Sequence, residues 1–92
     1  MSNQEIGAEL LHQAREWSKR KTNLFRVRAY RQAAISVMGL GREVREILRT
    51  EGKHGLIDVP GIGTSLAEDI ATFVRLGVWI ADEHRGPRRK AG

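Results

Sequence analysis

A single apolar residue stands between two glycines in Gly61-Ile62-Gly63, directly after Pro60 and directly before a segment with helical periodicity. Proline forces the residue before it into an extended conformation, so a helix upstream must end before this point. Glycine permits turns too tight for a side chain, and we expect both glycines to form such a turn, with Ile62 pointing inward. The segment predicts a tight connection between two helices. Backbone amides at the N-terminus of the second helix would then face outward, where they attract anions.

Two familiar phosphate-binding loops do not fit this segment. A dinucleotide fingerprint needs a third glycine and a preceding strand, and neither is present. A P-loop needs lysine after its last glycine, whereas Thr64 follows Gly63 here. A turn with a purely structural role remains the alternative interpretation.

Apolar spacing predicts helices along the whole chain and no strand, which makes the fold class all-α, with four to five helices in one compact domain. The first helix should run from about residue 3 to 20, with a capping box formed by Ser2 and Glu5. Thr22 or Asn23 should cap the second, which we expect to end at about residue 38 with a left-handed glycine in Gly39-Leu40-Gly41. Its expected apolar positions are Phe25, Ala29, Tyr30, Ala33, Ala34, Val37 and Met38.

The second half of the chain should contain shorter helices. We expect a helix over residues 42–50, a break at 51–55 and one helical turn at 56–58. The last helix should begin at Gly63 or Thr64, pack through Leu66, Ile70, Phe73 and Val74, and stop at Gly77. An apolar patch, Val78-Trp79-Ile80, should then cover the core.

Basic residues are concentrated in two stretches of the chain. The net charge is +5, and residues 15–42 hold eight basic residues against one acidic residue. Residues 84–92 add four basic residues, and we expect 81–92 to form a disordered basic tail. Such clusters are typical of proteins that bind polyanions. The alternative is a solvated surface that is basic without binding anything.

Several kinds of protein are excluded or disfavoured by composition. The chain has no cysteine, which excludes disulfides, thiolate zinc sites and a cysteine nucleophile. His12, His54 and His84 do not have the spacing of zinc ligands. The longest apolar runs are too short to cross a bilayer, so we expect no membrane partner. We expect a monomeric cytoplasmic protein, associated with the nucleoid if it is bacterial.

Two runs of sequence resemble known DNA-binding elements. VPGIGTSLAEDIATF (residues 59–73) resembles a helix-hairpin-helix motif. NLFRVRAYRQAA (residues 23–34) resembles the second helix of the amino-terminal domain of family X DNA polymerases. The resemblance covers about residues 3–79, and it implies one helix-hairpin-helix DNA-binding domain over residues 1–80, with no polymerase attached.

The resemblance also implies how DNA would be bound. In that family the hairpin holds backbone phosphates, and the matching backbone amides belong to Gly61, Ile62, Gly63, Thr64 and Ser65. The carbonyls that match a site for a monovalent cation, K⁺ or Na⁺, are those of Ile57, Val59 and Ile62. Arg26 and Tyr30 fall on positions of 5′-phosphate contacts, although Tyr30 could equally be a core aromatic. Arg28 and Arg31 would be exposed phosphate contacts or simply solvated charges.

One branch of that family removes a 5′-deoxyribose phosphate through a lysine Schiff base. Asp69 stands at the matching position, and Ser65 replaces a second lysine that binds phosphate. A carboxylate cannot form an imine, so we expect no enzyme activity; a residual lyase using a displaced lysine is the remote alternative. The expected function is DNA binding that is largely independent of sequence, at intact duplex, gaps or 5′-phosphate ends, in DNA repair.

A protein-interaction module that kept the fold but lost DNA binding is the second hypothesis. It rests on the acidic residues near the hairpin, Glu68 and Asp69, whose other role would be to complement the dipole in the first turn of the last helix. Such a module would use an apolar patch near Trp79. Trp17 and Trp79 are otherwise expected in the core or at an interface.

Overall fold

The structure is a computed structural model that describes residues 1–21 and 23–80. In these residues the chain forms five α-helices and no strand, which confirms the all-α class. The helices are α1 (Asn3–Arg20), α2 (Leu24–Met38), α3 (Val44–Glu51), α4 (Lys53–Ile57) and α5 (Thr64–Leu76). The expectations for Thr22 and for the tail at 81–92 lie outside the described residues.

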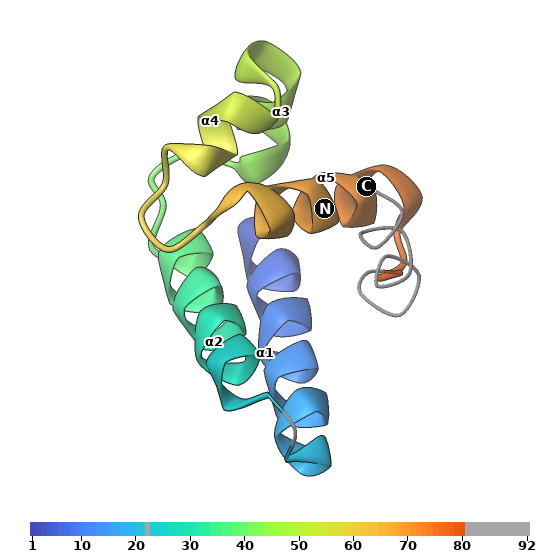
Figure 1. Ribbon diagram of the computed structural model, residues 1–92. Helices are drawn as coiled ribbons and strands as arrows, with labels where there is room; N and C mark the ends of the chain where they lie inside the picture. Colours follow the sequence, from blue (N-terminus) through green and yellow to red (C-terminus); the bar gives the residue numbers. More distant parts are fainter. Residues whose placement is uncertain (22, 81–92) are drawn as a thin grey trace, which may run out of the picture.

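Helices α1 and α2 lie side by side and run antiparallel, and α5 runs transversely to this pair (Figure 1). In the same view α3 and α4 lie on the other side of α5 from the pair. Buried side chains from all five helices and from the turn before α5 form one core. No described helix combines the length and the apolar character that a membrane crossing requires.

Helix α1 has the predicted bounds because both of its ends are determined locally. The Ser2 hydroxyl accepts the Glu5 amide at 3.2 Å, and the Glu5 carboxylate accepts the Ser2 amide at 2.7 Å, so the predicted capping box is confirmed. Lys21 ends the helix in the left-handed conformation, with φ of 56°. The buried apolar positions are Ile6, Leu10 and Ala14.

Helix α2 begins after Asn23, whose side chain accepts the Arg26 amide at 3.0 Å. The predicted buried face is wrong at Phe25, which is 82% exposed, whereas Val27 is buried. Two residues of an α-helix turn through about 200°, so these two side chains point in nearly opposite directions. The remaining buried positions are Tyr30, Ala33, Ala34 and Val37.

The predicted left-handed glycine at the end of α2 is also wrong. Gly39 has a right-handed conformation, and Gly41 has no positive φ. Instead the last turn tightens, because the Leu40 amide donates to the Val37 carbonyl at 3.2 Å. A tightened turn satisfies a terminal carbonyl without a left-handed residue.

The second half of the chain departs from the predictions at α3 and α4. Helix α3 begins at Val44, two residues later than predicted, and the predicted break at 51–55 is wrong because only Gly52 interrupts the helices. Helix α4 packs close to α3: a Cβ on Gly55 would lie 2.5 Å from the Ile47 Cγ2. Glycine at 55 therefore serves a close helix contact and does not break the helix.

Helix α5 has the predicted bounds and ends at Gly77, which has a φ of 81°. The patch predicted at 78–80 is confirmed only for Trp79, which packs against the core, while Val78 and Ile80 are exposed. The Trp79 ring meets the rings of Tyr30 and Phe73 edge to face, at centroid distances of 5.9 and 5.7 Å.

Candidate nucleic-acid interface

The turn between α4 and α5 is closed by its own backbone and by one buried side chain. The Ile62 amide donates to the Val59 carbonyl at 3.0 Å. The Ile62 side chain points into the core and is 3% exposed, as predicted. The turn is thus a rigid hairpin anchored from within, and its residues 60, 61 and 63 are left on the surface.

The hairpin docks on α2 through Pro60 and Gly61. The Ser36 hydroxyl donates to the Pro60 carbonyl at 2.6 Å. Gly61 has a φ of 91°, and a Cβ there would lie 2.9 Å from the Gln32 Cγ and 3.1 Å from the Ser36 Oγ. Both the backbone conformation and the contact with α2 therefore require glycine at 61.

Gly63 differs from Gly61, and the expectation that both glycines serve a tight turn is wrong for it. Its backbone is extended, with φ of −88° and ψ of −178°, and apart from its two chain neighbours no described residue has an atom within 4 Å of a Cβ built there. No packing contact among the described residues explains the glycine. An exposed backbone without a side chain does allow a ligand to come close to it.

Gly63 is the N-cap of α5 and has no side chain to accept amides of the first turn. The first-turn amides of a helix have no acceptor within the helix, and they make its N-terminus attract anions. The first turn contains no acidic residue. Glu68 and Asp69 lie in the second turn, so their expected place in the first turn is wrong; Glu68 instead forms an ion pair with Lys53 at 3.0 Å.

The three carbonyls that the resemblance assigns to a cation lie around the same hairpin. Ile57 ends α4, and the Val59 carbonyl already accepts the Ile62 amide. A carbonyl oxygen has two lone pairs, so this bond leaves room for a second contact. The described residues contain no cluster of three carboxylate or imidazole side chains, so a cation here would depend on backbone oxygens.

Three arginines of α2 occupy different surroundings. Arg28 is exposed and lies on one helical row with Gln32 and Ser36, the two residues that contact the hairpin. Arg31 is exposed but lies off that row. Sequence reasoning missed Gln32, although its four-residue spacing from Arg28 could have indicated it.

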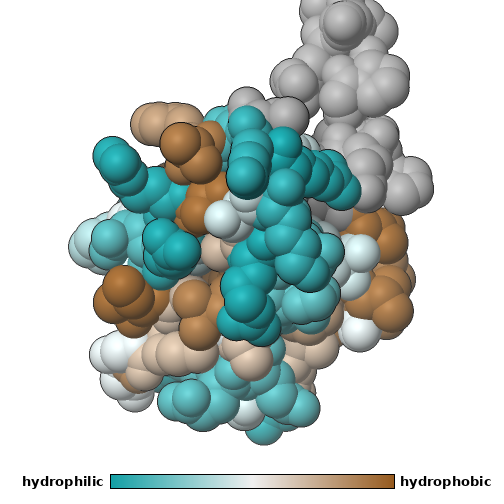
Figure 2. Space-filling view, turned by 90° about the horizontal axis from the view of Figure 1, so that it is seen from below, coloured by the Kyte–Doolittle hydropathy of each residue, from teal (hydrophilic) through white to brown (hydrophobic). Residues whose placement is uncertain are grey.

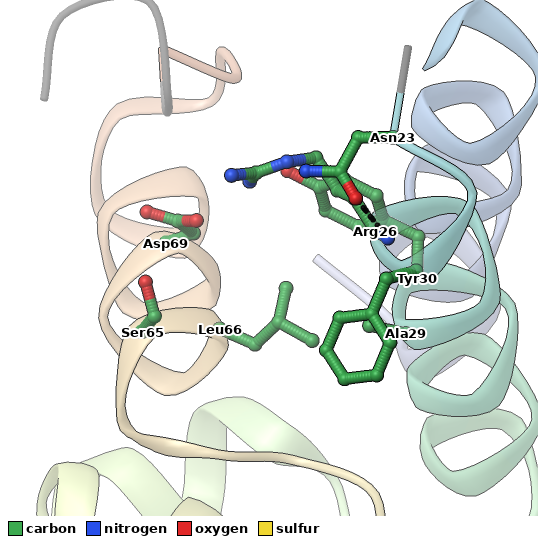
Figure 3. A pocket seen from close by; sticks show the side chains of 8 residues that line it. Asn23, Arg26, Ala29, Tyr30, Ser65, Leu66 and Asp69 are labelled. Carbon is green, nitrogen blue, oxygen red and sulfur yellow. Dashed lines mark hydrogen bonds between the residues drawn. The ribbon is translucent and has the colours of Figure 1, made fainter. Parts of the chain in front are cut away.

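Arg26 points instead into a pocket between α2 and α5 (Figure 3). The pocket has a volume of about 210 Å³. Side chains from α2 and its cap reach toward the start of α5, which contributes the facing wall. The lining residues are Asn23, Phe25, Arg26, Ala29, Tyr30, Ser65, Leu66 and Asp69.

This pocket brings together Arg26, Tyr30 and Ser65, three residues that the resemblance assigns to phosphate or DNA contacts. It also includes Asp69, the residue at the Schiff-base position. Arg28, Arg31 and residues 61–64 are outside it. The candidate residues therefore fall into two neighbouring surfaces: the hairpin with the α2 row, and the α2–α5 pocket.

The aromatic residues near the pocket have different roles. Tyr30 is 1% exposed and packs on Trp79, so its ring belongs to the core while it also lines the pocket. Trp17 is half-buried, and the guanidinium groups of Arg20 and Arg26 lie over its ring, 4.4 and 4.7 Å from the centroid. Cation–π contacts of this kind hold the two arginines in place.

At the end of the molecule where the chain passes from α1 to α2, cationic and apolar side chains lie together. Hydrophilic side chains dominate the centre of this face, and hydrophobic groups emerge between them (Figure 2). The exposed residues on the adjoining ends of the two helices are Lys19, Arg20, Lys21, Leu24 and Phe25. Cations beside an exposed aromatic ring, here that of Phe25, are the combination with which proteins bind phosphates and stack bases of single strands.

Comparison with known protein families shows a match over most of the chain. The sequence profile described as a helix-hairpin-helix domain matches residues 1–78, which is most of the chain. Searches of the curated proteins and of the solved structures found no significant match. The match supports DNA as a partner.

Proposed function

The chain belongs to the helix-hairpin-helix domain family, and on that premise we propose that it binds the DNA backbone without reading base sequence. The observation that carries this proposal is the N-terminus of α5. A glycine without packing neighbours caps it, its first turn has no acidic residue, and it follows a hairpin fixed to α2. Backbone amides contact phosphates and carry no sequence information.

In this proposal one strand of the duplex lies across the hairpin and the neighbouring row of α2. Phosphates meet the amides at Gly63 and Thr64, and Arg28 adds a cation on the row that contains Gln32. Phosphate contacts from arginine add affinity that falls as salt rises. The basic stretch at residues 15–42 supports a largely electrostatic interaction.

We also propose that the domain acts without catalysis, in repair of DNA with gaps or ends. The resemblance to family X polymerases places Asp69 where an amine would form an imine, and a carboxylate has no such chemistry. In this proposal a strand end lies in the pocket beside the hairpin.

The second hypothesis, a protein-interaction module, finds less support. It needs an apolar patch near Trp79; the Trp79 ring packs on Tyr30 and Phe73, so only its exposed neighbours Val78 and Ile80 could form that patch. It also needs free acidic groups beside the hairpin, whereas Glu68 is paired with Lys53. The same experiment tests it, because such a module would not bind DNA.

The test uses a substitution that blocks the α5 N-terminus without harming the fold. Asp at position 63 is a favourable N-cap in an extended backbone, so Gly63→Asp should retain or slightly raise stability. Its carboxylate would accept the first-turn amides and repel phosphate. Gly61 is less suitable, since any side chain there would displace the hairpin from α2.

The matched control is Gln4→Glu, which makes the same change in net charge in the first turn of α1, at an exposed position. We expect fluorescence anisotropy with an intact duplex to show about tenfold or more weaker binding for Gly63→Asp than for Gln4→Glu, with a shallower dependence on salt. Equal affinities of the two folded variants would refute phosphate binding at the N-terminus of α5. No binding by the wild-type protein, even at low salt, would refute DNA binding and favour the interaction module.

A further inference from the structure

The pocket between α2 and α5 has a lining that does not match a phosphate group. Only two of its eight residues carry charge, and these are of opposite sign: Arg26 and Asp69. Asn23, Tyr30 and Ser65 are polar and neutral, and the other three residues are apolar. A phosphate terminus, with a charge near −2, is best held where cations predominate.

Asp69 determines whether the pocket prefers a hydroxyl group or a phosphate group. Its side chain lies on the pocket wall of α5, opposite the Arg26 side chain (Figure 3). The residue is 7% exposed, so water and salt screen its charge less than on the open surface. The Asp69 carboxylate offsets the charge of Arg26, so the lining of this pocket of about 210 Å³ has no net positive charge to hold a phosphate. The same carboxylate is a strong acceptor for a hydroxyl group.

We propose that this pocket binds a hydroxyl-bearing nucleotide terminus at a break in DNA, and that Asp69 excludes the phosphorylated terminus. This inference rests on the proposed DNA binding and gives that function a substrate class. It departs from what the resemblance implies, namely a 5′-phosphate site, because Asp69 and Ser65 replace the two lysines.

The position of the pocket relative to the hairpin supports a strand end as the ligand. Ser65 belongs to the first turn of α5, directly after the glycine cap, and also lines the pocket. A strand whose phosphate sits at the α5 N-terminus therefore has its next unit at the pocket. The volume is smaller than the roughly 300–1,000 Å³ that holds a drug-sized ligand, which suits one terminal sugar.

Both a 5′-hydroxyl and a 3′-hydroxyl terminus present this chemistry, and the experiment separates them. Four duplexes with a one-nucleotide gap would carry hydroxyl or phosphate at the 5′ and 3′ sides of the gap in all combinations, with an intact duplex as reference. We expect phosphate at one of the two sides to weaken wild-type binding by at least about threefold, and that side identifies the terminus bound.

Equal affinity for all four gaps, or tighter binding to a phosphorylated gap, would overturn the inference. In either case, binding to the intact duplex would leave the proposed function standing. Failure to bind any DNA would instead refute the proposed function. These outcomes need only the wild-type protein, so they do not depend on whether a variant folds.

Two neighbouring variants then test the role of Asp69 as a residue that determines specificity. Asp69→Asn and Glu68→Gln each remove one negative charge from adjacent positions, but only Asp69 lines the pocket. Asp69→Asn should bind phosphorylated and hydroxyl gaps alike, while Glu68→Gln should discriminate between them as the wild type does. Discrimination that survives in Asp69→Asn, or that disappears in Glu68→Gln, would contradict the assignment.

Discussion

Arginine side chains on α2 look equivalent in the sequence but differ in what surrounds them. Arg26 packs over Trp17 and lines the pocket, whereas Arg28 and Arg31 extend into solvent. Arg28 shares a row with the residues that hold the hairpin, and Arg31 lies beside exposed Ile35 on another part of the helix surface. We therefore propose that Arg28, and not Arg31, contacts a phosphate bound at the hairpin.

Arg28→Ala and Arg31→Ala are therefore a matched pair. Each removes one charge from an exposed position of α2. A lost phosphate contact lowers the slope of log affinity against log salt by about 1. We expect this change for Arg28→Ala and a slope near that of the wild type for Arg31→Ala, measured by anisotropy across a salt series. A larger change of the salt slope for Arg31→Ala than for Arg28→Ala would indicate that DNA binds a different face of α2.

Some helix ends could be predicted from the sequence because a nearby residue caps them. The start of α3 could not, because the residue that caps it is distant along the chain. Ser2, Asn23 and Gly77 act within a few residues of the ends that they determine. The start of α3 has no such cap: the Asn3 side chain accepts the Val44 amide at 2.7 Å and donates to the Arg42 carbonyl at 2.7 Å. Asn3 is 41 positions away from Val44, and spacing along the chain contains no signal for that pair.

The capping box of α1 makes the stability of this helix depend on pH. The Ser2 backbone amide donates to the Glu5 carboxylate and, with the Ser2 hydroxyl, lowers the pKa of Glu5 below its ordinary value. A carboxyl whose pKa is lowered by folding contributes stability above its ordinary pKa, and this contribution is lost as pH falls through the lowered value.

We therefore expect acidification from about pH 6 to pH 3 to lower the thermal midpoint of the wild type more than that of Glu5→Gln, which has no carboxyl to protonate. Circular dichroism melts at a series of pH values measure both curves. Parallel curves for the two proteins would show that the capping box does not contribute to acid sensitivity.

In the whole molecule, one tryptophan beyond the last helix joins elements that are far apart in sequence. The Trp79 ring contacts Tyr30 of α2 and Phe73 of α5 edge to face. Such aromatic pairs add stability beyond the area that they bury. Because Tyr30 and α5 also form the pocket, Trp79 holds the two pocket walls in their relative positions.

Trp79→Ala should lower the free energy of unfolding by about 1–3 kcal/mol, less than for a fully buried ring because Trp79 is only half-buried. Val78→Ala changes an exposed neighbour and should alter stability by about 0.5 kcal/mol or less. Chemical denaturation measures both values. Similar losses for the two variants would mean that the Trp79 contacts do not hold the fold together.

The candidate site could be predicted in part, since the hairpin, its buried Ile62 and the arginines of α2 stand in recognisable spacings. The periodicity of apolar residues could not predict which other side chains surround each residue in the fold. Phe25 has an apolar side chain at helical spacing, yet no element covers it, and it lines the mouth of a pocket. Gln32 has no motif of its own and becomes part of the interface only because Gly61 docks beside it.

Local sequence was enough to predict the helical class, the capping box of α1, the start of α2, the hairpin and the end of α5, because each depends on residues within a few positions of one another. Tertiary contacts were needed to establish the start of α3, the helical state of residues 53–57 and the convergence of Arg26, Tyr30, Ser65 and Asp69 in one pocket. These features depend on contacts between segments that are distant along the chain. Such contacts form when the chain buries its apolar surface, and no local pattern encodes which distant groups then meet.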